Sequence, residues 1–178
     1  MTIGIIGGAG YTGGELLRIL LNHPEARIAF VHSNSQTGKP VWATHADLVG
    51  DTELKFTGEP DLGAAGVLFL CSGHGESKKF LAENPLADGQ KVIDLSTDFR
   101  DQSAGFVYGL PELQRESIRN AQKIANPGCF ATSIELALLP LAAAGLLEGD
   151  VHVSAITGST GAGQALAPTS HFSWRSNN

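Results

Sequence analysis

Short apolar runs alternate with amphipathic segments along most of this chain. The apolar runs predict five β-strands, at residues 2–6, 27–33, 66–71, 91–96 and 123–126. The segments between them predict three helices, at residues 14–24, 76–86 and 111–121. Strands that alternate with helices are typical of βαβ units, and therefore of a parallel sheet with helices on both faces. The pattern indicates an α/β fold.

The pattern changes after the fifth strand. A strongly apolar helix is predicted at residues 129–145, where Pro140 favours a kink or a break. A sixth strand is predicted at residues 151–157, ahead of a second glycine-rich segment. We therefore expect one domain at residues 1–127 and the beginning of another at residues 128–178.

Three glycines follow the first strand and open the first helix, which is the position of a dinucleotide-binding turn. Gly7, Gly10 and Gly13 form a G-x-x-G-x-x-G variant of that fingerprint. The free N–H groups and the dipole of a helix N-terminus favour a phosphate, and glycine lets it approach the backbone closely. We expect these glycines, with Tyr11 and Thr12, to bind a dinucleotide in a Rossmann-type domain. The alternative is a tight turn that binds no ligand.

The end of the second strand bears on which dinucleotide is bound. NAD enzymes usually place an acid there to hold the ribose 2′-OH. No acid occurs between Glu25 and Asp47 in this chain. Ser33 and Ser35 offer hydroxyl donors and Lys39 offers a cation, which suits the 2′-phosphate of NADP. We therefore expect NADP rather than NAD, the alternative being an ordinary polar loop.

Two further glycine-rich turns follow strands and are expected to face ligands. In CSGHG, the backbone of Ser72 and Gly73 is expected to line the pyrophosphate or the nicotinamide ribose. His74 of the same turn is either a contact or a surface side chain. In TGSTGAG, Gly158 and Gly161 are expected to form an anion-binding nest that faces the nicotinamide or the phosphate of a substrate, with a flexible linker as the alternative.

The two cysteines stand in different settings. Cys129 follows the Pro127-Gly128 turn and opens the apolar helix, and a helix N-terminus favours the thiolate form. A thiolate beside a nicotinamide has an evident use, because it can form a thioester that then accepts a hydride. Cys129 is thus the candidate catalytic nucleophile, and a core cysteine is the alternative. Cys71 ends an apolar strand and is interpreted as a buried small side chain.

Composition narrows the function classes. The net charge of -6 comes without a run of like charges, which argues against nucleic acid or an anionic membrane as a partner. Two distant cysteines form no disulfide framework and no metal-binding pattern. The N-terminal segment has no basic region, and its apolar run is too short for a signal peptide or a membrane span. A cytoplasmic protein with a small-molecule ligand is expected.

Five segments together resemble the N-acetyl-γ-glutamyl-phosphate reductase family of arginine biosynthesis: GGAGYTGGELLRIL, IDLSTDFR, YGLPEL, NPGCFATSIELALLPL and TGSTGAG. The resemblance covers the whole chain. It implies an NADP-binding Rossmann domain followed by a substrate domain like that of glyceraldehyde-3-phosphate dehydrogenase, in a homo-oligomer. It also implies that Cys129 attacks an acyl phosphate, N-acetyl-glutamyl 5-phosphate, and that NADPH reduces the resulting thioester to the semialdehyde.

The same resemblance makes Tyr108 and Glu112 of YGLPE substrate-side candidates, although Glu112 is also explained as the acid of a helix start. Near the end of the chain, Ser170, His171 and Arg175 are candidates for binding the phosphate or the carboxylates of the substrate. A frayed polar terminus is the alternative there.

In the family that the chain resembles, the polypeptide continues well beyond residue 178, and the general acid–base histidine lies in that part. We therefore interpret the chain as an N-terminal fragment that leaves apolar surface exposed or pairs with another copy. On its own it is expected to bind NADP weakly and not to turn over. Alternatives are an aspartate-semialdehyde dehydrogenase or an aminoadipate-pathway relative, a non-catalytic NADP-binding module, and a Rossmann-type binder of another nucleotide.

Overall fold

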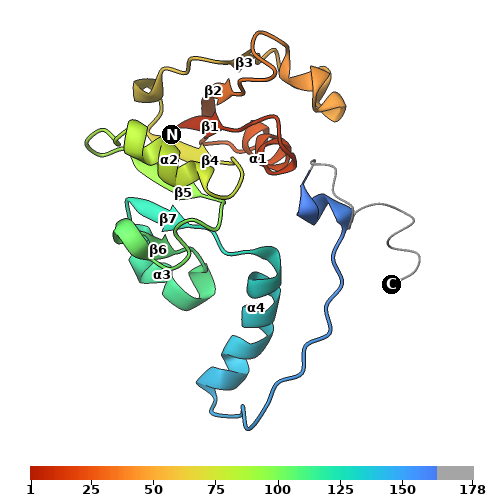
Figure 1. Ribbon diagram of the computed structural model, residues 1–178, viewed down its shortest axis with the longest axis vertical. Coiled ribbons are helices and arrows are strands. Elements are labelled where there is room, and N and C mark those ends of the chain that lie inside the picture. Colours follow the sequence, from red (N-terminus) through yellow and green to blue (C-terminus); the bar gives the residue numbers. More distant parts are fainter. Residues whose placement is uncertain (164–178) are drawn as a thin grey trace.

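Within residues 1–163, which this computed structural model describes, seven strands form a sheet in the order β3-β2-β1-β4-β5-β7-β6 (Figure 1). The strands are β1 (Thr2–Ile6), β2 (Arg27–His32), β3 (Phe56–Thr57), β4 (Val67–Leu70), β5 (Lys91–Asp94), β6 (Val107–Tyr108) and β7 (Lys123–Ala125). All pairings between these strands are parallel. The α/β class and the five strands predicted up to residue 126 are confirmed. β3 and β6 have two residues each, too few to show a hydrophobic period.

The α-helices of the described range are α1 (Tyr11–Leu21), α2 (Glu76–Glu83), α3 (Pro111–Asn120) and α4 (Cys129–Ala143). Short 3-10 helices are η1 (Val41–Ala43), η2 (Ala46–Leu48), η3 (Leu62–Ala64), η4 (Ser103–Gly105) and η5 (Ser159–Ala162). α1 begins at Tyr11 rather than at residue 14, because its first turn includes Gly13 and Gly14. Pro140 lies inside α4, which continues to Ala143, so the helix is not broken there; the kink, the other expected outcome, stays a prediction.

The apolar core lies on both faces of the sheet. On one face, Leu17 and Leu20 of α1 pack with residues of β1 and β2 and with Val41 and Leu48 from the loop after β2. On the other face, residues of β4 and β5 pack with Phe99, and α2 lies against this cluster. The two clusters fix the orientation of the loops that follow β1, β4 and β5.

The α1 side of the sheet is less covered than the sequence pattern predicts. Beside α1, an apolar groove crosses the sheet, and its lining includes Ile3, Val67, Phe69, Ile93 and Ile124. Of the described α-helices, only α1 contributes side chains to the core cluster on this side, together with Val41 of η1 and Leu48 of η2. Helices nevertheless lie on both faces as predicted, with α1 on this side and α2 on the other.

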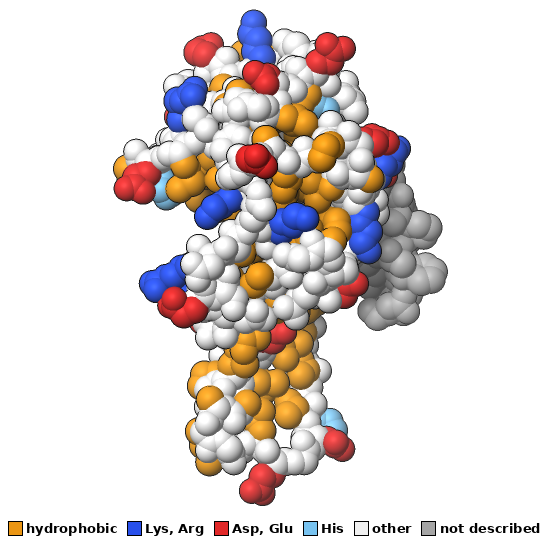
Figure 2. All heavy atoms as spheres, turned by 90° about the vertical axis from the view of Figure 1, so that its left-hand side faces the viewer, with side chains coloured by type: hydrophobic (Ala, Val, Ile, Leu, Met, Phe, Trp, Pro, Cys, Tyr) orange, Lys and Arg blue, Asp and Glu red, His pale blue; other side chains and the backbone are white. Residues whose placement is uncertain are grey.

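Helix α4 projects away from the sheet, and an extended segment leads from its end back towards α1 (Figure 1). Phe130, Leu136 and Leu141 of α4 are 41–43% exposed, and Figure 2 shows hydrophobic side chains gathered over the projecting part. The apolar surface expected on this helix is thus open to solvent. The strand predicted at residues 151–157 is wrong, because this segment has no pairing partner among the described residues.

Candidate active site

A cleft of about 550 Å³ lies at the carboxyl ends of the strands. β1 is the switch point of the topology, because its neighbours β2 and β4 lead to opposite sides of the sheet. Open α/β sheets bind ligands in the crevice at such a point. The cleft is lined by segments that are far apart in the sequence: Gly10, Tyr11, Thr12, Cys71, Ser72, Gly73, His74, Leu95, Arg100, Asn126, Pro127, Gly128, Cys129, Thr160, Gly161 and Gly163.

The cleft brings together only some of the residues predicted from the sequence. Those that line it are Gly10, Tyr11, Thr12, Ser72, Gly73, Cys129 and Gly161. Those that do not are Gly7, Gly13, Ser33, Ser35, Lys39 and Gly158. The candidates Ser170, His171 and Arg175 lie outside the described residues.

The glycines of the turn after β1 serve two different purposes. Gly7 has a φ of +77°, and a Cβ there would lie 2.9 Å from the backbone nitrogen of Ser72. A Cβ on Gly13 would lie 2.6 Å from the Cα of Gly8, so close backbone packing requires both glycines. A Cβ on Gly10 would meet nothing closer than 3.7 Å, although Gly10 lines the cleft. Packing leaves room at Gly10, and a phosphate lying against the backbone would fill it.

The start of α1 is well suited to an anion. Its N-cap, Gly10, makes no side-chain cap, and the first turn contains no acid. The N–H groups of a first helical turn have no partner within the helix, and the helix dipole makes this end positive. The turn after β4 lies opposite, where Gly73 has no atom within 4 Å of a Cβ position. Two backbone turns thus face the cleft, with free space beside the backbone at Gly10 and Gly73.

The loop after β2 does not line the cleft, and it carries the residues expected to select NADP. Ser33 is 6% exposed, and its hydroxyl lies 3.4 Å from that of Ser35. Thr37 donates a hydrogen bond to the carbonyl oxygen of Ser33 at 2.9 Å, which holds the loop against the end of β2. The exposed ammonium of Lys39 donates to Gln36 at 3.1 Å. The cation is therefore tied only to a neighbouring, uncharged amide.

Cys129 is an exposed residue at the start of α4, with no side-chain cap at the preceding Gly128. Gly128 has an ordinary φ of -73°. The Nη1 atom of Arg100 would lie 3.0 Å from a Cβ there, so this long side chain would have to shift slightly to admit one. Arg100 donates through Nε to the carbonyl oxygen of Asn126 at 2.9 Å and through Nη2 to that of Leu95 at 3.1 Å.

Sequence reasoning missed Arg100 as a site residue. Its guanidinium lies against the turn that carries Cys129 and lines the same cleft. The available signal was its position shortly after the buried strand β5, at the edge of the sheet where ligands bind. Its position in the sequence does not determine the direction of the Arg100 side chain. The contact between Arg100 and the turn that carries Cys129 is therefore seen only in the fold.

A buried polar network fixes the segment between β5 and Arg100. The carboxylate of Asp94 is fully buried and accepts hydrogen bonds from the hydroxyls of Ser77 at 2.5 Å and Ser96 at 2.7 Å. The backbone N–H of Ser96 also donates to Asp94, at 3.1 Å. A buried carboxylate with several donors is stable only in one arrangement, so this network ties β5 to the start of α2.

Asp98 caps the first turn of α2 from outside that helix. It accepts hydrogen bonds from the backbone N–H groups of Gly75 at 2.6 Å and Lys78 at 3.0 Å. Burial opposes the charged form of Asp98, but these N–H donors outweigh it and lower its pKa. Nearby, the Nδ1 atom of His74 accepts from the N–H of Thr97 at 3.2 Å. The hydrogen of a neutral His74 therefore resides on Nε2. His74 is also one of the residues that line the cleft.

Tyr108 and Glu112 do not line the cleft. The hydroxyl of Tyr108 donates to the carboxylate of Glu135 in α4, with distances of 3.1 and 3.2 Å to its two oxygens. Burial, followed by this carboxylate, raises the pKa of Tyr108. Glu112 lies in the first turn of α3 directly after Pro111, which matches its alternative interpretation as part of a helix start.

Cys71 shares the cleft with Cys129 but lies in a different environment. It is half-buried at the end of β4 and packs against the core cluster on the α1 side. Burial, together with the charge of Asp94, raises the pKa of Cys71 to about 12. This agrees with its interpretation as a small apolar side chain rather than a nucleophile.

Residues 2–121 match the model of the family described as semialdehyde dehydrogenase, NAD binding domain. The chain belongs to the semialdehyde dehydrogenase family. Residues 129–178 match a second model, described as semialdehyde dehydrogenase, dimerisation domain. The architecture is therefore an NAD(P)-binding Rossmann domain joined to the start of a dimerisation domain. Within residues 1–163, this family member has no helix with the length and apolar character needed to cross a membrane.

Similar proteins carry a more specific name. The N-acetyl-gamma-glutamyl-phosphate reductase of Christiangramia forsetii is 59% identical over 177 residues, which is 98% of this chain and 55% of that protein. The reductase of the same name from Azobacteroides pseudotrichonymphae is 56% identical over 178 residues, or 99% of this chain and 56% of that protein. The chain thus spans about half the length of the curated relatives it matches.

Solved structures of the semialdehyde dehydrogenase family share the fold. Aspartate semialdehyde dehydrogenase II of Vibrio cholerae, complexed with ASA, gives a TM-score of 0.63 at 25% identity, covering 80% of this chain and 46% of that one. The aspartate semialdehyde dehydrogenase of Candida albicans with NADP gives a TM-score of 0.60 at 14% identity, covering 82% of this chain and 48% of that one. The second likeness shows the fold alone.

Proposed function

We propose that the whole protein reduces N-acetyl-glutamyl 5-phosphate to N-acetyl-glutamate 5-semialdehyde and phosphate with NADPH, a step of arginine biosynthesis. The observation that carries this proposal is the position of Cys129, at the start of α4 and in the same cleft as the glycine turn after β1. The identity of 59% to a reductase of that name supports the substrate. Aspartyl phosphate is the competing substrate, because a solved aspartate semialdehyde dehydrogenase is 25% identical.

The described residues fit a dinucleotide. The uncapped first turn of α1, at Tyr11 and Thr12, would hold the pyrophosphate against the open backbone at Gly10. The turn after β4, at Ser72 and Gly73, would line its other side, and Gly161 of the later glycine segment would close the cleft. Gly158, which does not line the cleft, would act only as the residue that precedes η5. Bound NADPH supplies the hydride that reduces the thioester carbon.

Selectivity for NADP is assigned to the loop after β2. Ser33 and Ser35 would donate to a ribose 2′-phosphate, and Lys39 would turn from Gln36 to pair with it. The Lys39→Ala variant should therefore weaken NADPH binding by about tenfold and change NADH binding by less than about twofold. Lys91→Ala, at the opposite end of the strands, is the matched control. An equal loss of affinity for NADPH and NADH in Lys39→Ala would refute the assignment of NADP selectivity to this loop.

The chemistry at the substrate is assigned to Cys129. Its thiolate attacks the carbonyl carbon of the acyl phosphate, a C–S bond forms, and the C–O bond to phosphate breaks as phosphate leaves. The first N–H groups of α4 are unpaired within the helix, so that of Cys129 can donate to the developing oxyanion. Arg100 lies beside this turn and would balance the charge of the phosphate. After reduction, the hemithioacetal expels the thiolate and releases the aldehyde.

Steady-state kinetics of the whole protein test the proposal. NADPH oxidation is followed with N-acetyl-glutamyl phosphate and, separately, with aspartyl phosphate. Turnover of the first substrate that is lost in Cys129→Ser and retained in Cys71→Ser supports the proposal. Preference for aspartyl phosphate would change the substrate, and full activity of Cys129→Ser would refute the mechanism. The chain of 178 residues alone is expected to bind NADP weakly and not to turn over.

The same proposal covers the organisation of the protein. Residues 1–127 would bind the cofactor, and residues 128–178 would begin the substrate domain. A homo-oligomer is expected from the match to a dimerisation domain. The cytoplasm is the expected location, since the thiol of Cys129 must stay reduced to act.

A further inference from the structure

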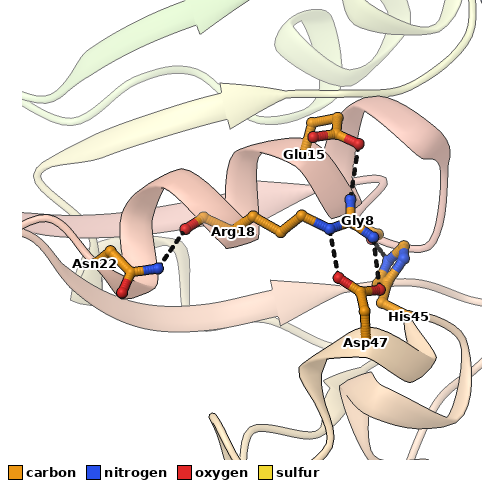
Figure 3. Close-up of polar contacts among 6 residues, drawn as sticks. All are labelled: Gly8, Glu15, Arg18, Asn22, His45 and Asp47. Carbon is orange, nitrogen blue, oxygen red and sulfur yellow. Dashed lines mark hydrogen bonds and ion pairs between the residues drawn. The ribbon is translucent and has the colours of Figure 1, made fainter.

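His45 is a buried histidine that no step of the proposed reaction uses. It lies between η1 and η2 in the loop after β2 and is 6% exposed. Its Nε2 atom is 2.8 Å from the carbonyl oxygen of Gly8 (Figure 3). Because a carbonyl oxygen only accepts, Nε2 carries the hydrogen and donates it to Gly8.

Gly8 belongs to the glycine turn after β1 and is held on several sides. Its N–H donates to the carbonyl oxygen of His32 at 2.9 Å. A side chain on Gly8 would collide with Val31. Gly13 of α1 approaches Gly8 so closely that a Cβ on Gly13 would lie 2.6 Å from the Cα of Gly8. The bond from His45 therefore adds a contact to the Gly8 carbonyl, in the peptide unit that follows the one held by His32.

The contact between His45 and α1 also explains a glycine that the phosphate turn does not need. Gly14 is a buried residue inside α1, where glycine costs about 1 kcal/mol of helix stability relative to alanine. A Cβ on Gly14 would lie 2.7 Å from both Cε1 and Nδ1 of the His45 ring. Gly14 thus makes room for the imidazole directly behind the turn.

The segment that carries His45 is anchored to the same helix. Asp47 forms a bidentate pair with Arg18 of α1, with distances of 2.6 and 2.7 Å, and Arg18 also contacts Glu15 at 2.9 Å (Figure 3). On the inner side, Val41 and Leu48 are buried in the core. These contacts hold the segment that carries His45 against α1 on one side and against the core on the other.

We propose that His45 is a positioning residue of the cofactor site. Its Nε2 donates a hydrogen bond to the Gly8 carbonyl oxygen, and so keeps Gly7 to Gly10 in the backbone conformation that the pyrophosphate requires. This role rests on the proposed binding of NADPH. The local part of the claim, that the bond orders the turn, holds with or without the ligand.

The first test compares His45→Ala with His45→Gln in the whole protein. Loss of one hydrogen bond should raise the Kd for NADPH about three- to tenfold in His45→Ala, and raise KM for NADPH with little change in kcat. The glutamine amide reaches a similar position and should restore Kd to within about twofold. His23→Ala, which replaces an exposed histidine at the end of α1, is the control. Wild-type Kd in His45→Ala, or no rescue by glutamine, would overturn the proposal.

The second test needs no cofactor. Hydrogen exchange of the Gly8 and Gly10 amides should be faster in His45→Ala than in the wild type, while exchange in β5 stays unchanged. If the wild type itself fails to bind NADPH, the proposed function falls, and this local result still decides the role of His45. Unchanged exchange at the turn would refute it, and general acceleration would show a merely structural role.

Discussion

The two cysteines of the cleft should differ greatly in reactivity although a reagent reaches both through the same opening. Cys71 and Cys129 both line the cleft. Cys71 is half-buried at the end of β4, where burial raises its pKa to about 12, whereas Cys129 is exposed at the start of α4. Only the thiolate form is alkylated, so the environment decides the rate.

The slow alkylation expected of Cys71 follows from its own thiolate fraction. At about pH 8, a thiol with a pKa of about 12 is ionised in roughly one molecule in 10⁴. A cysteine with the reference pKa of about 8.5 is roughly one-quarter ionised at that pH. Alkylation of Cys71 should therefore be slower than that of such a thiol by about three orders of magnitude.

Iodoacetamide labelling read by peptide mass spectrometry measures this difference. The Cys129 peptide should be modified completely before modification of Cys71 is detected. The rate at Cys71 should then rise about tenfold per pH unit up to about pH 11, because its thiolate fraction is still increasing. Cys129→Ser should remove nearly all labelling, and Cys71→Ser should leave it unchanged. Comparable rates at the two cysteines, or a flat pH profile for Cys71, would refute the reasoning.

Three further predictions concern the supports of the site. Gly13→Ala should lower the free energy of unfolding by about 1–3 kcal/mol in a urea titration, because its Cβ would lie 2.6 Å from backbone of Gly8; unchanged stability would contradict that crowding. Asp98 has a lowered pKa in the folded protein, so its stabilising effect is present above its unfolded pKa of about 3.9 and is lost as pH falls through the folded value. Asp98→Asn should therefore flatten the acid limb of a stability-against-pH curve, and an unaltered limb would argue against this source of stability. The lysine of Arg100→Lys cannot donate to two carbonyl oxygens at once as the guanidinium does. The kcat/KM for the acyl phosphate should therefore fall at least about tenfold, while the Kd for NADPH changes by less than about twofold. An equal loss in both quantities would place Arg100 at the cofactor instead.

Local patterns predicted the parts of the fold that depend on neighbouring residues. The strands up to residue 126 and the glycine turn at Gly7 to Gly13 are confirmed at their expected places. Cys129 lies at the start of its helix, as the Pro-Gly turn before it predicts. The strand expected at residues 151–157 is wrong, because a strand depends on a distant partner as well as on its own residues. Its apolar alternation describes a strand face, but a strand also needs a partner, and the described residues provide none.

Contacts between distant parts of the chain could not be predicted in the same way. His45 and Gly8 are 37 positions apart, and Arg100 and Asn126 are 26 positions apart. Gly128 is typical of a turn in the sequence, yet its φ is ordinary and the Arg100 guanidinium lies close to it. A single sequence shows that such a glycine is present, but only the packing of the fold shows which side chain lies beside it.

Trapping the covalent intermediate tests the central claim most directly. The whole protein is mixed with N-acetyl-glutamyl phosphate without NADPH, quenched in acid, digested and analysed by mass spectrometry. We predict an N-acetyl-glutamyl adduct on the peptide that contains Cys129, absent in Cys129→Ser and discharged when NADPH is added before the quench. An adduct on another residue, or substrate turnover in Cys129→Ser, would contradict the assignment of Cys129 as the nucleophile.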